Sequence, residues 1–214
     1  MPRRPRKPSR LEAPRSLSPL PWSGSASLEL VHEFNELFIE QMVDAARRDG
    51  PCTRLDVARM HRDLWTSLDA PARRRLGQCP FLLADIQFRN AAWWERAQSG
   101  AVLQDGPPGP DCPFSRAAAS ELMRDALVVA WSICRQDRRL AATLLLMSGE
   151  VARIVARLGL AQLRNMPDRH YQHLRPRWED QGYVWDRLLT AARHDDRKAL
   201  CDMHLHAFQL ADAD

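Results

Sequence analysis

Apolar residues recur at intervals of three and four along most of the chain, which is the spacing of one face of an α-helix. The first such stretch carries its apolar residues at Leu30, Phe34, Leu37, Phe38 and Met42. Glutamates occupy the opposite side, and a Gly-Pro pair at residues 50–51 predicts the end of this helix. A second helical pattern follows over residues 55–68.

Short polar side chains that can cap a helix precede most of the remaining helical stretches. They are Asp69, Asn90, Ser115, Ser148, and either Asp195 or Asp196. We expect the Ser148 helix to end at Gly159 and a further short segment to begin at Asp168. Residues 81–88 are almost continuously apolar and fit a buried strand or a buried helix equally well. Together these patterns predict an all-α protein.

Composition divides the chain into four parts. Residues 1–24 are rich in Pro, Arg and Ser and predict a disordered arm; residues 25–98 form a helical region whose role the sequence does not indicate. Residues 99–113 are a Gly/Pro-rich linker, and residues 114–214 form a C-terminal helical domain. The arm holds six basic residues and one acidic residue, whereas the rest of the chain is nearly neutral. A strongly basic DNA-binding body is therefore not expected.

The location of the protein follows from its cysteines and its apolar runs. Five widely spaced cysteines, an odd number, indicate free thiols in a reducing compartment, and we expect a cytoplasmic protein. No apolar run approaches the roughly 18 residues of a membrane span, and no apolar stretch follows the basic N-terminus as in a secretory signal. We expect no membrane association.

Motifs for catalysis or for metal binding are absent from the sequence. It has no glycine-rich phosphate loop, no paired-histidine zinc helix and no nucleophile-elbow serine, so we expect neither an enzyme nor a small-molecule substrate nor a cofactor. Cys201, His204 and His206 are close in sequence. On a helix, however, residue 206 would point away from the other two, so we expect no metal site.

The stretch from Asp125 to the end resembles the flagellar transcriptional activator FlhD family. Residues 130–138 (AWSICRQDR) match the family's leading helix in hydrophobic phase and in its closing Asp-Arg pair. Residues 148–152 (SGEVA) match a helix start, and residues 156–163 (ARLGLAQL) match the following piece without gaps. Pro176-Arg177-Trp178 takes the place of an aromatic-Arg-aromatic element. The likeness spans somewhat under half of the chain.

This resemblance implies a transcriptional activator that works as a homodimer or with a protein partner that supplies most of the sequence reading. We expect Leu144, Leu145, Met147 and Trp178 at a dimer or partner interface. One departure affects DNA contact: the family's Phe-Arg-Leu-Gly is Thr-Leu-Leu-Leu here, at residues 143–146. The family's arginine, which lies where DNA is approached, is thus a leucine that cannot bind phosphate.

Other basic residues could take over this contact with the phosphate backbone. The candidates are Arg135, Arg138, Arg139, Arg153 and Arg157 in the body, and Arg3, Arg4, Arg6 and Lys7 in the arm. The competing hypothesis is a helical adaptor for protein-protein interaction, secretion-related or an anti-regulator, with no DNA role. The nearly neutral body and the missing arginine favour this alternative.

Overall fold

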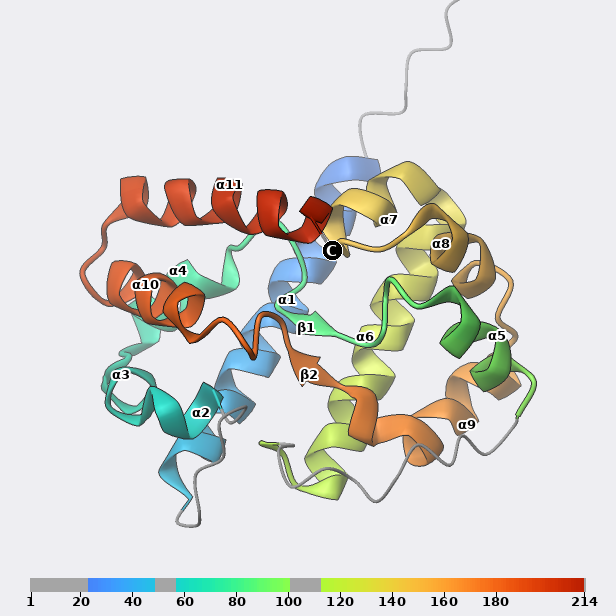
Figure 1. Ribbon diagram of the computed structural model, residues 1–214, viewed down its shortest axis with the longest axis horizontal. Helices are drawn as coiled ribbons and strands as arrows, with labels where there is room; N and C mark the ends of the chain where they lie inside the picture. Colours follow the sequence, from blue (N-terminus) through green and yellow to red (C-terminus); the bar gives the residue numbers. More distant parts are fainter. Residues whose placement is uncertain (1–22, 49–56, 101–112, 214) are drawn as a thin grey trace, which may run out of the picture.

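The structure, a computed structural model, describes residues 23–48, 57–100 and 113–213. Within these ranges the chain forms eleven α-helices, one 3₁₀ helix and a single pair of two-residue strands (Figure 1). The predicted all-α class is confirmed. The predicted arm up to residue 22 and most of the predicted linker, residues 101–112, lie outside the described residues. No helix in the described ranges is both long enough and apolar enough to cross a membrane.

The helices in chain order are α1 (Ser23–Arg47), α2 (Val57–Met60), α3 (Arg62–Ser67), α4 (Ala70–Gly77), α5 (Ala91–Gln98), α6 (Arg116–Gln136), α7 (Arg138–Leu144), α8 (Gly149–Val155), α9 (Leu160–His170), the 3₁₀ helix η1 (Tyr171–His173), α10 (Gly182–Arg193) and α11 (Arg197–Ala213).

Helix α1 has the amphipathic character that its sequence predicts. Phe34, Phe38 and Met42 are buried, as expected. Leu37 was expected on the same face but is 46% exposed, because the centre of the buried face lies on the side of α1 away from Leu37. A polar residue, Asn35, takes a fully buried position within that face.

Asn35 anchors the chain that follows α4. Its side-chain Nδ2 donates to the carbonyl of Phe81 at 2.9 Å, and its Oδ1 accepts from the backbone N–H of Leu83 at 2.9 Å. Two longer bonds of 3.4 Å reach the carbonyls of Gly77 and Cys79. One side chain therefore supplies the partners that a buried, non-helical backbone needs.

In the described residues 57–80 the chain forms three short helices. The continuous pattern over residues 55–68 is interrupted at His61, between α2 and α3. Helix α4 begins as predicted, because the Asp69 carboxylate accepts from the backbone N–H of Ala72 at 2.7 Å, and Pro71 fits in the first turn.

Residues 81–88 are neither a helix nor a full strand. Only β1 (Ala84–Asp85) is extended, and it pairs antiparallel with β2 (Arg175–Pro176). The segment also bonds to the connection between α7 and α8: the Leu82 N–H donates to the Leu144 carbonyl at 2.8 Å, and the Ser148 N–H donates to the Phe88 carbonyl at 3.0 Å. Its backbone partners thus come from distant parts of the chain, which local periodicity cannot indicate.

From Asn90 onward the predicted caps are correct at several positions. Asn90, Ser115 and Ser148 each accept a hydrogen bond from the backbone N–H three residues later. The predicted end at Gly159 is wrong: α8 ends at Val155, and Gly159 instead precedes α9. Its N–H donates to Gln162 Oε1 at 2.8 Å. Asp168 does not begin a segment, because it lies inside α9 one residue after Pro167.

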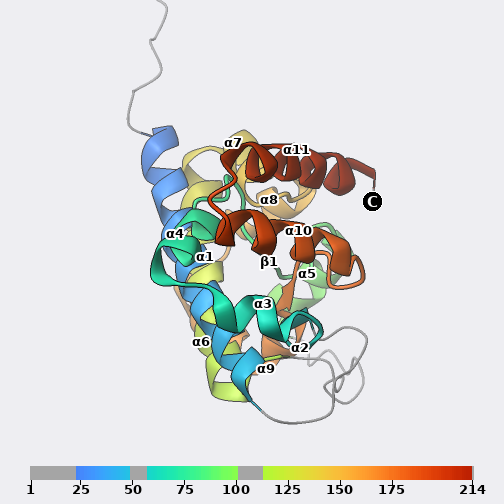
Figure 2. The same cartoon turned by 90° about the vertical axis from the view of Figure 1, so that its left-hand side faces the viewer.

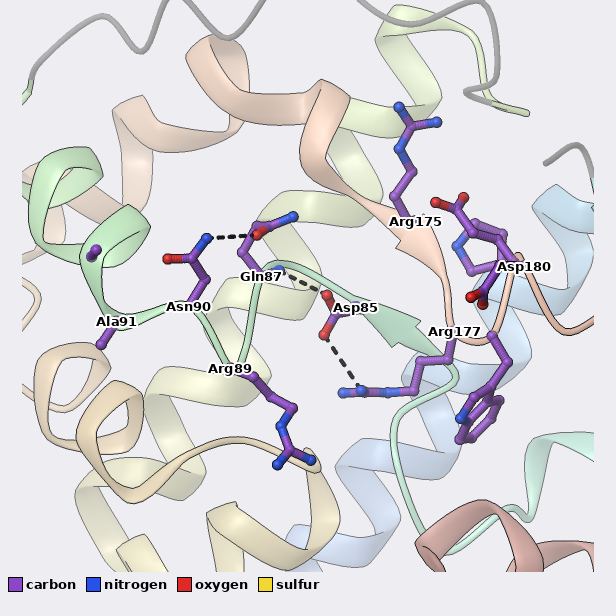
Figure 3. Close-up of a pocket in the computed structure, with 12 residues that line it drawn as sticks. Asp85, Gln87, Arg89, Asn90, Ala91, Arg175, Arg177 and Asp180 are labelled. Atoms are coloured by element: carbon purple, nitrogen blue, oxygen red, sulfur yellow. Dashed lines mark hydrogen bonds and ion pairs between the residues drawn. The ribbon is translucent and has the colours of Figure 1, made fainter. Parts of the chain in front are cut away.

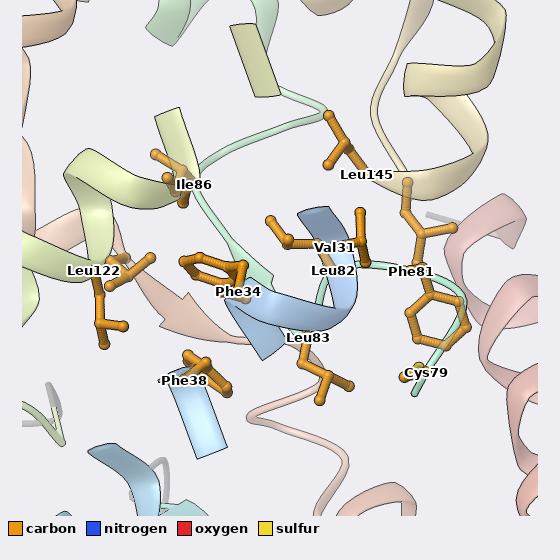
Figure 4. Packing of buried hydrophobic residues seen from close by; sticks show 14 of the residues in the cluster. Val31, Phe34, Phe38, Cys79, Phe81, Leu82, Leu83, Ile86, Leu122 and Leu145 are labelled. Carbon is orange, nitrogen blue, oxygen red and sulfur yellow. The ribbon is translucent and has the colours of Figure 1, made fainter. Parts of the chain in front are cut away.

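One hydrophobic cluster includes residues from both halves of the described chain. We call residues 81–88 the central segment. Phe34 and Phe38 of α1 lie near Leu122 of α6 and Leu83 of this segment (Figure 4). Helix α1 packs lengthwise against α6, and α10 and α11 cover the adjoining side (Figure 2). The predicted helical region and the predicted C-terminal domain therefore share a core.

Helix α7 ends in a motif that usually requires glycine. The Met147 N–H donates to the carbonyl of Ala142 at 3.2 Å, the six-to-one bond of a Schellman motif. Leu146 occupies the left-handed position of this motif with φ +46°. A leucine rarely adopts this conformation, so the residue is strained here.

We expect Leu146→Gly to destabilise the protein by about 1 kcal/mol less than Leu145→Gly, because glycine removes the cost of a left-handed leucine. Both side chains are buried, so both variants lose comparable packing. Urea denaturation of the two variants measures the difference. An equal loss of stability would mean that Leu146 is not strained.

Candidate nucleic-acid interface

Four of the arginines proposed from the sequence line one surface hollow. The hollow has a volume of about 340 Å³ and lies where the end of α6, the start of α7 and the end of α8 meet. Its lining consists of Cys134, Arg135, Gln136, Arg138, Arg153, Ala156 and Arg157. No carboxylate is part of this lining. We call this cluster the arginine hollow.

The first arginine of the hollow is held by a tryptophan. The guanidinium of Arg135 lies 4.8 Å from the centre of the Trp131 ring, a cation-π contact one helical turn apart. The indole N–H of Trp131 donates to the carbonyl of Leu158 at 2.9 Å, just beyond α8. Trp131 therefore joins α6 to the end of α8 and orients Arg135 at their junction. The spacing of four residues between Trp131 and Arg135 is the one sequence signal for this contact.

The carboxylate nearest to these arginines in sequence, that of Asp137, accepts hydrogen bonds from the backbone. Asp137 separates α6 from α7, and its Oδ1 accepts from the N–H groups of Arg139 and Leu140 at 2.8 and 3.2 Å. This cap turns the chain sharply and places Arg138 in the first turn of α7. Asp137 thus positions the hollow without pairing with any of its arginines.

The remaining two arginines of the hollow come from α8 and the turn after it. Arg153 lies in the last turn of α8, and Arg157 follows in a turn in which its N–H donates to the Ile154 carbonyl at 3.0 Å. Arg139 was predicted with this group but lies outside the lining. Within the described residues none of the hollow's four arginines forms an ion pair, whereas Arg75 and Arg124 pair with aspartates. The hollow is therefore a concentrated and uncompensated positive site.

Carbonyl groups at the ends of α6 and α8 also favour positive charge, so these arginines stabilise helix ends as well. That role alone needs one cation per helix end. Four arginines converging from three helices exceed it.

Helix α1 begins close to α7, the helix that contributes Arg138 to the hollow. The first turns of α1 lie beside α7 (Figure 1), and the two helices are in contact. Arg3, Arg4, Arg6 and Lys7 themselves lie outside the described residues. They are covalently linked to the start of α1.

The residues predicted at an interface are mostly inside the single chain. Leu144, Leu145 and Met147 are 7%, 0% and 5% exposed, because they pack in the core of their own chain. Trp178 is half-buried with its ring edge-to-face against Phe81, at 5.6 Å between ring centres. A second chain could contact the first three only if this core opened. The large apolar side chains that the described surface does expose are Leu37, Met60, Val128, Leu160, Tyr183 and Leu205.

Thiols and imidazoles in the described part of the chain form no group of three or more that could hold a metal. Burial raises the pKa of Cys134, at the floor of the hollow, to about 12, so it stays a neutral thiol. Burial lowers the pKa of His204 to about 4, and its ring packs edge-to-face on Phe81.

We compared the chain with known protein families, characterised proteins and solved structures, and none of them matches it significantly. The resemblance to the FlhD family stays a prediction from the quoted motifs.

Proposed function

We propose that this protein is a DNA-binding transcriptional regulator of the FlhD type. Its arginine hollow would contact the phosphate backbone, and the basic arm would add affinity that does not depend on sequence. The observation that carries the proposal is the convergence of Arg135, Arg138, Arg153 and Arg157 without any carboxylate among them. Guanidinium groups bind phosphate oxygens in pairs, which makes such a cluster well suited to a nucleic-acid backbone.

In this chain the contact with DNA would lie at a different place from that in the family. Leu144 stands at the position of the family's arginine and is buried, so the route used in the family is closed here. Leu144 is the last residue of α7. The hollow is formed by the start of α7, with Arg138, and by the end of α8. As in the family, a dimer or a partner protein would supply base recognition.

We expect the change of all four hollow arginines to glutamine to weaken DNA binding at least 100-fold at low salt. Each lost phosphate contact lowers the slope of log affinity against log salt by about 0.9, so the slope falls by roughly 3 to 4. Fluorescence anisotropy with a labelled duplex at several salt concentrations measures both quantities.

The matched control is the change of Arg74, Arg96, Arg187 and Arg193, which are exposed elsewhere, to glutamine. It removes the same charge, and we expect less than a threefold effect. Equal losses in the two quadruple variants would show that only net charge matters and would refute the hollow as a site. Deleting residues 1–22 separates arm from body: binding that survives this deletion must still depend on the hollow.

The alternative is an adaptor that binds proteins and not DNA. The closed arginine position at Leu144 favours it specifically. In that case the protein without residues 1–22 has no salt-sensitive affinity for DNA.

A further inference from the structure

Two surface cavities are each lined by three or more arginines, and they arrange these side chains differently. In the larger one, of about 660 Å³, Arg89 and Arg175 extend in opposite directions (Figure 3). Arg177 lies in the same cavity, but its guanidinium is buried, bonds to two backbone carbonyls and pairs with Asp85. These three guanidinium groups therefore do not converge on one point.

The arginine hollow has the opposite arrangement. Arg135, Arg138, Arg153 and Arg157 line one volume of about 340 Å³, and the rest of its lining is uncharged. That size lies within the range of small-molecule sites, about 300–1,000 Å³. Two of the uncharged side chains, those of a cysteine and an alanine, are small and leave room between the arginines. A DNA backbone is extended and can contact the rim of the hollow, whereas a small ligand can enter it.

The hollow carries more positive charge than its own chain balances. Within the described residues none of its four arginines forms an ion pair, and no carboxylate lines it. Like charges that share one small volume repel one another, and an anion with several charges relieves this repulsion at all four positions. A triphosphate chain carries about four negative charges, because its terminal phosphate has about two and each inner phosphate has one. Its charge therefore matches that of the hollow.

One arginine of the hollow and the backbone of a second are held in place by the fold. The Arg135 guanidinium lies 4.8 Å from the centre of the Trp131 ring, and the indole N–H fixes that ring by donating to the Leu158 carbonyl at 2.9 Å. Asp137 caps the first turn of α7 and so fixes the backbone of Arg138. Groups that are already ordered lose less entropy on binding, which favours tight binding of a small ligand.

We propose that the arginine hollow binds a small polyphosphate, that is a chain of linked phosphate groups, either free or as part of a nucleotide. The four guanidinium groups would bond to the non-bridging phosphate oxygens. Because the same arginines would contact DNA, this ligand would compete with DNA and so regulate its binding. The competition rests on the proposed function, whereas the binding of the polyphosphate does not.

The test is calorimetric titration of the full-length protein with sodium tripolyphosphate, ATP and inorganic phosphate, without divalent cations. We expect tripolyphosphate to bind at least tenfold more tightly than inorganic phosphate, because it can contact all four arginines at once. ATP that binds as tightly as tripolyphosphate identifies a nucleotide as a source of the ligand, and ATP that binds at least tenfold less tightly identifies a free polyphosphate. Equal affinities for tripolyphosphate and inorganic phosphate would overturn the proposal.

Single substitutions locate the binding. Arg138→Gln and Arg153→Gln should each weaken tripolyphosphate binding at least tenfold, and binding should shift the indole N–H resonance of Trp131, assigned with Trp131→Phe. Arg139→Gln is the matched control, because Arg139 is the next residue of α7, is exposed and lies outside the lining; it should change the affinity less than twofold. Equal losses in Arg138→Gln and Arg139→Gln would show a diffuse attraction to the surface and no site in the hollow.

Fluorescence anisotropy with a labelled DNA duplex tests the competition and separates the two proposals. At constant ionic strength tripolyphosphate should release the duplex, and sodium sulfate should need at least a tenfold higher concentration. A duplex that stays bound at saturating tripolyphosphate would refute the competition. If tripolyphosphate binds in the hollow but the protein binds no DNA, the proposed function fails and the polyphosphate site stands. If DNA binds through the hollow and tripolyphosphate does not bind, only the polyphosphate site is wrong.

Discussion

Replacing Arg177 by methionine is expected to lower the free energy of unfolding by about 3–5 kcal/mol. The side chain is 8% exposed and joins the central segment, the end of α7 and β2 through its guanidinium. Burial lowers its pKa, while the Asp85 carboxylate raises it in part, so the charged form depends on these partners. Methionine fills a similar volume but leaves the partly buried Asp85 carboxylate without its cation and the Leu82 and Leu145 carbonyls without their donor.

Thermal and urea denaturation of Arg177→Met measure this effect, and the midpoint should fall by about 10 °C for a chain of this size. Arg187→Met, at an exposed position of α10, is the matched control and should change stability by less than about 0.5 kcal/mol. Similar midpoints for the two variants would contradict a structural role for Arg177.

Replacing Asn35 by alanine is expected to cost about 2–4 kcal/mol, because two buried backbone groups lose their partners at once. The carbonyl of Phe81 and the N–H of Leu83 both bond to this one amide at 2.9 Å, and α1 supplies no other polar side chain at that point. The segment after α4 would then lose its attachment to α1.

Asn165→Ala, at an exposed position of α9, is the control and should be nearly neutral. Urea denaturation compares the two variants, and hydrogen exchange of the Leu83 amide reports the local effect. Exchange at Leu83 that is no faster in Asn35→Ala than in the native protein would show that the bond is dispensable.

The arginines of the candidate site could be predicted from the sequence, but their arrangement could not. The arginines were named from their positions near the resemblance, and four of the five body candidates do line one hollow. What could not be foreseen was the sharp turn at Asp137, which brings the start of α7 next to the end of α8. The predicted interface at Leu144, Leu145 and Met147 shows the reverse situation: an apolar run is compatible with a core or with an interface, and only packing distinguishes the two.

The cavity of about 660 Å³ between residues 85–92 and 175–180 could not be predicted from the sequence. Arg89 and Arg175 are far apart in the chain, and each looks like an ordinary surface arginine. Both line the same cavity because β1 and β2 pair, with Asp85 opposite Arg175. A two-residue strand has no periodicity from which it could be recognised.

Local chemistry by itself determined the all-α class, most helix starts and the positive charge of the arm, because apolar spacing and capping act within a few residues of each other. The tertiary structure alone decided which of the polar residues became internal anchors, as for Asn35 and Arg177. The physical reason is that a buried polar group must find its partner in whatever segment packs against it, and that segment is chosen by the fold as a whole.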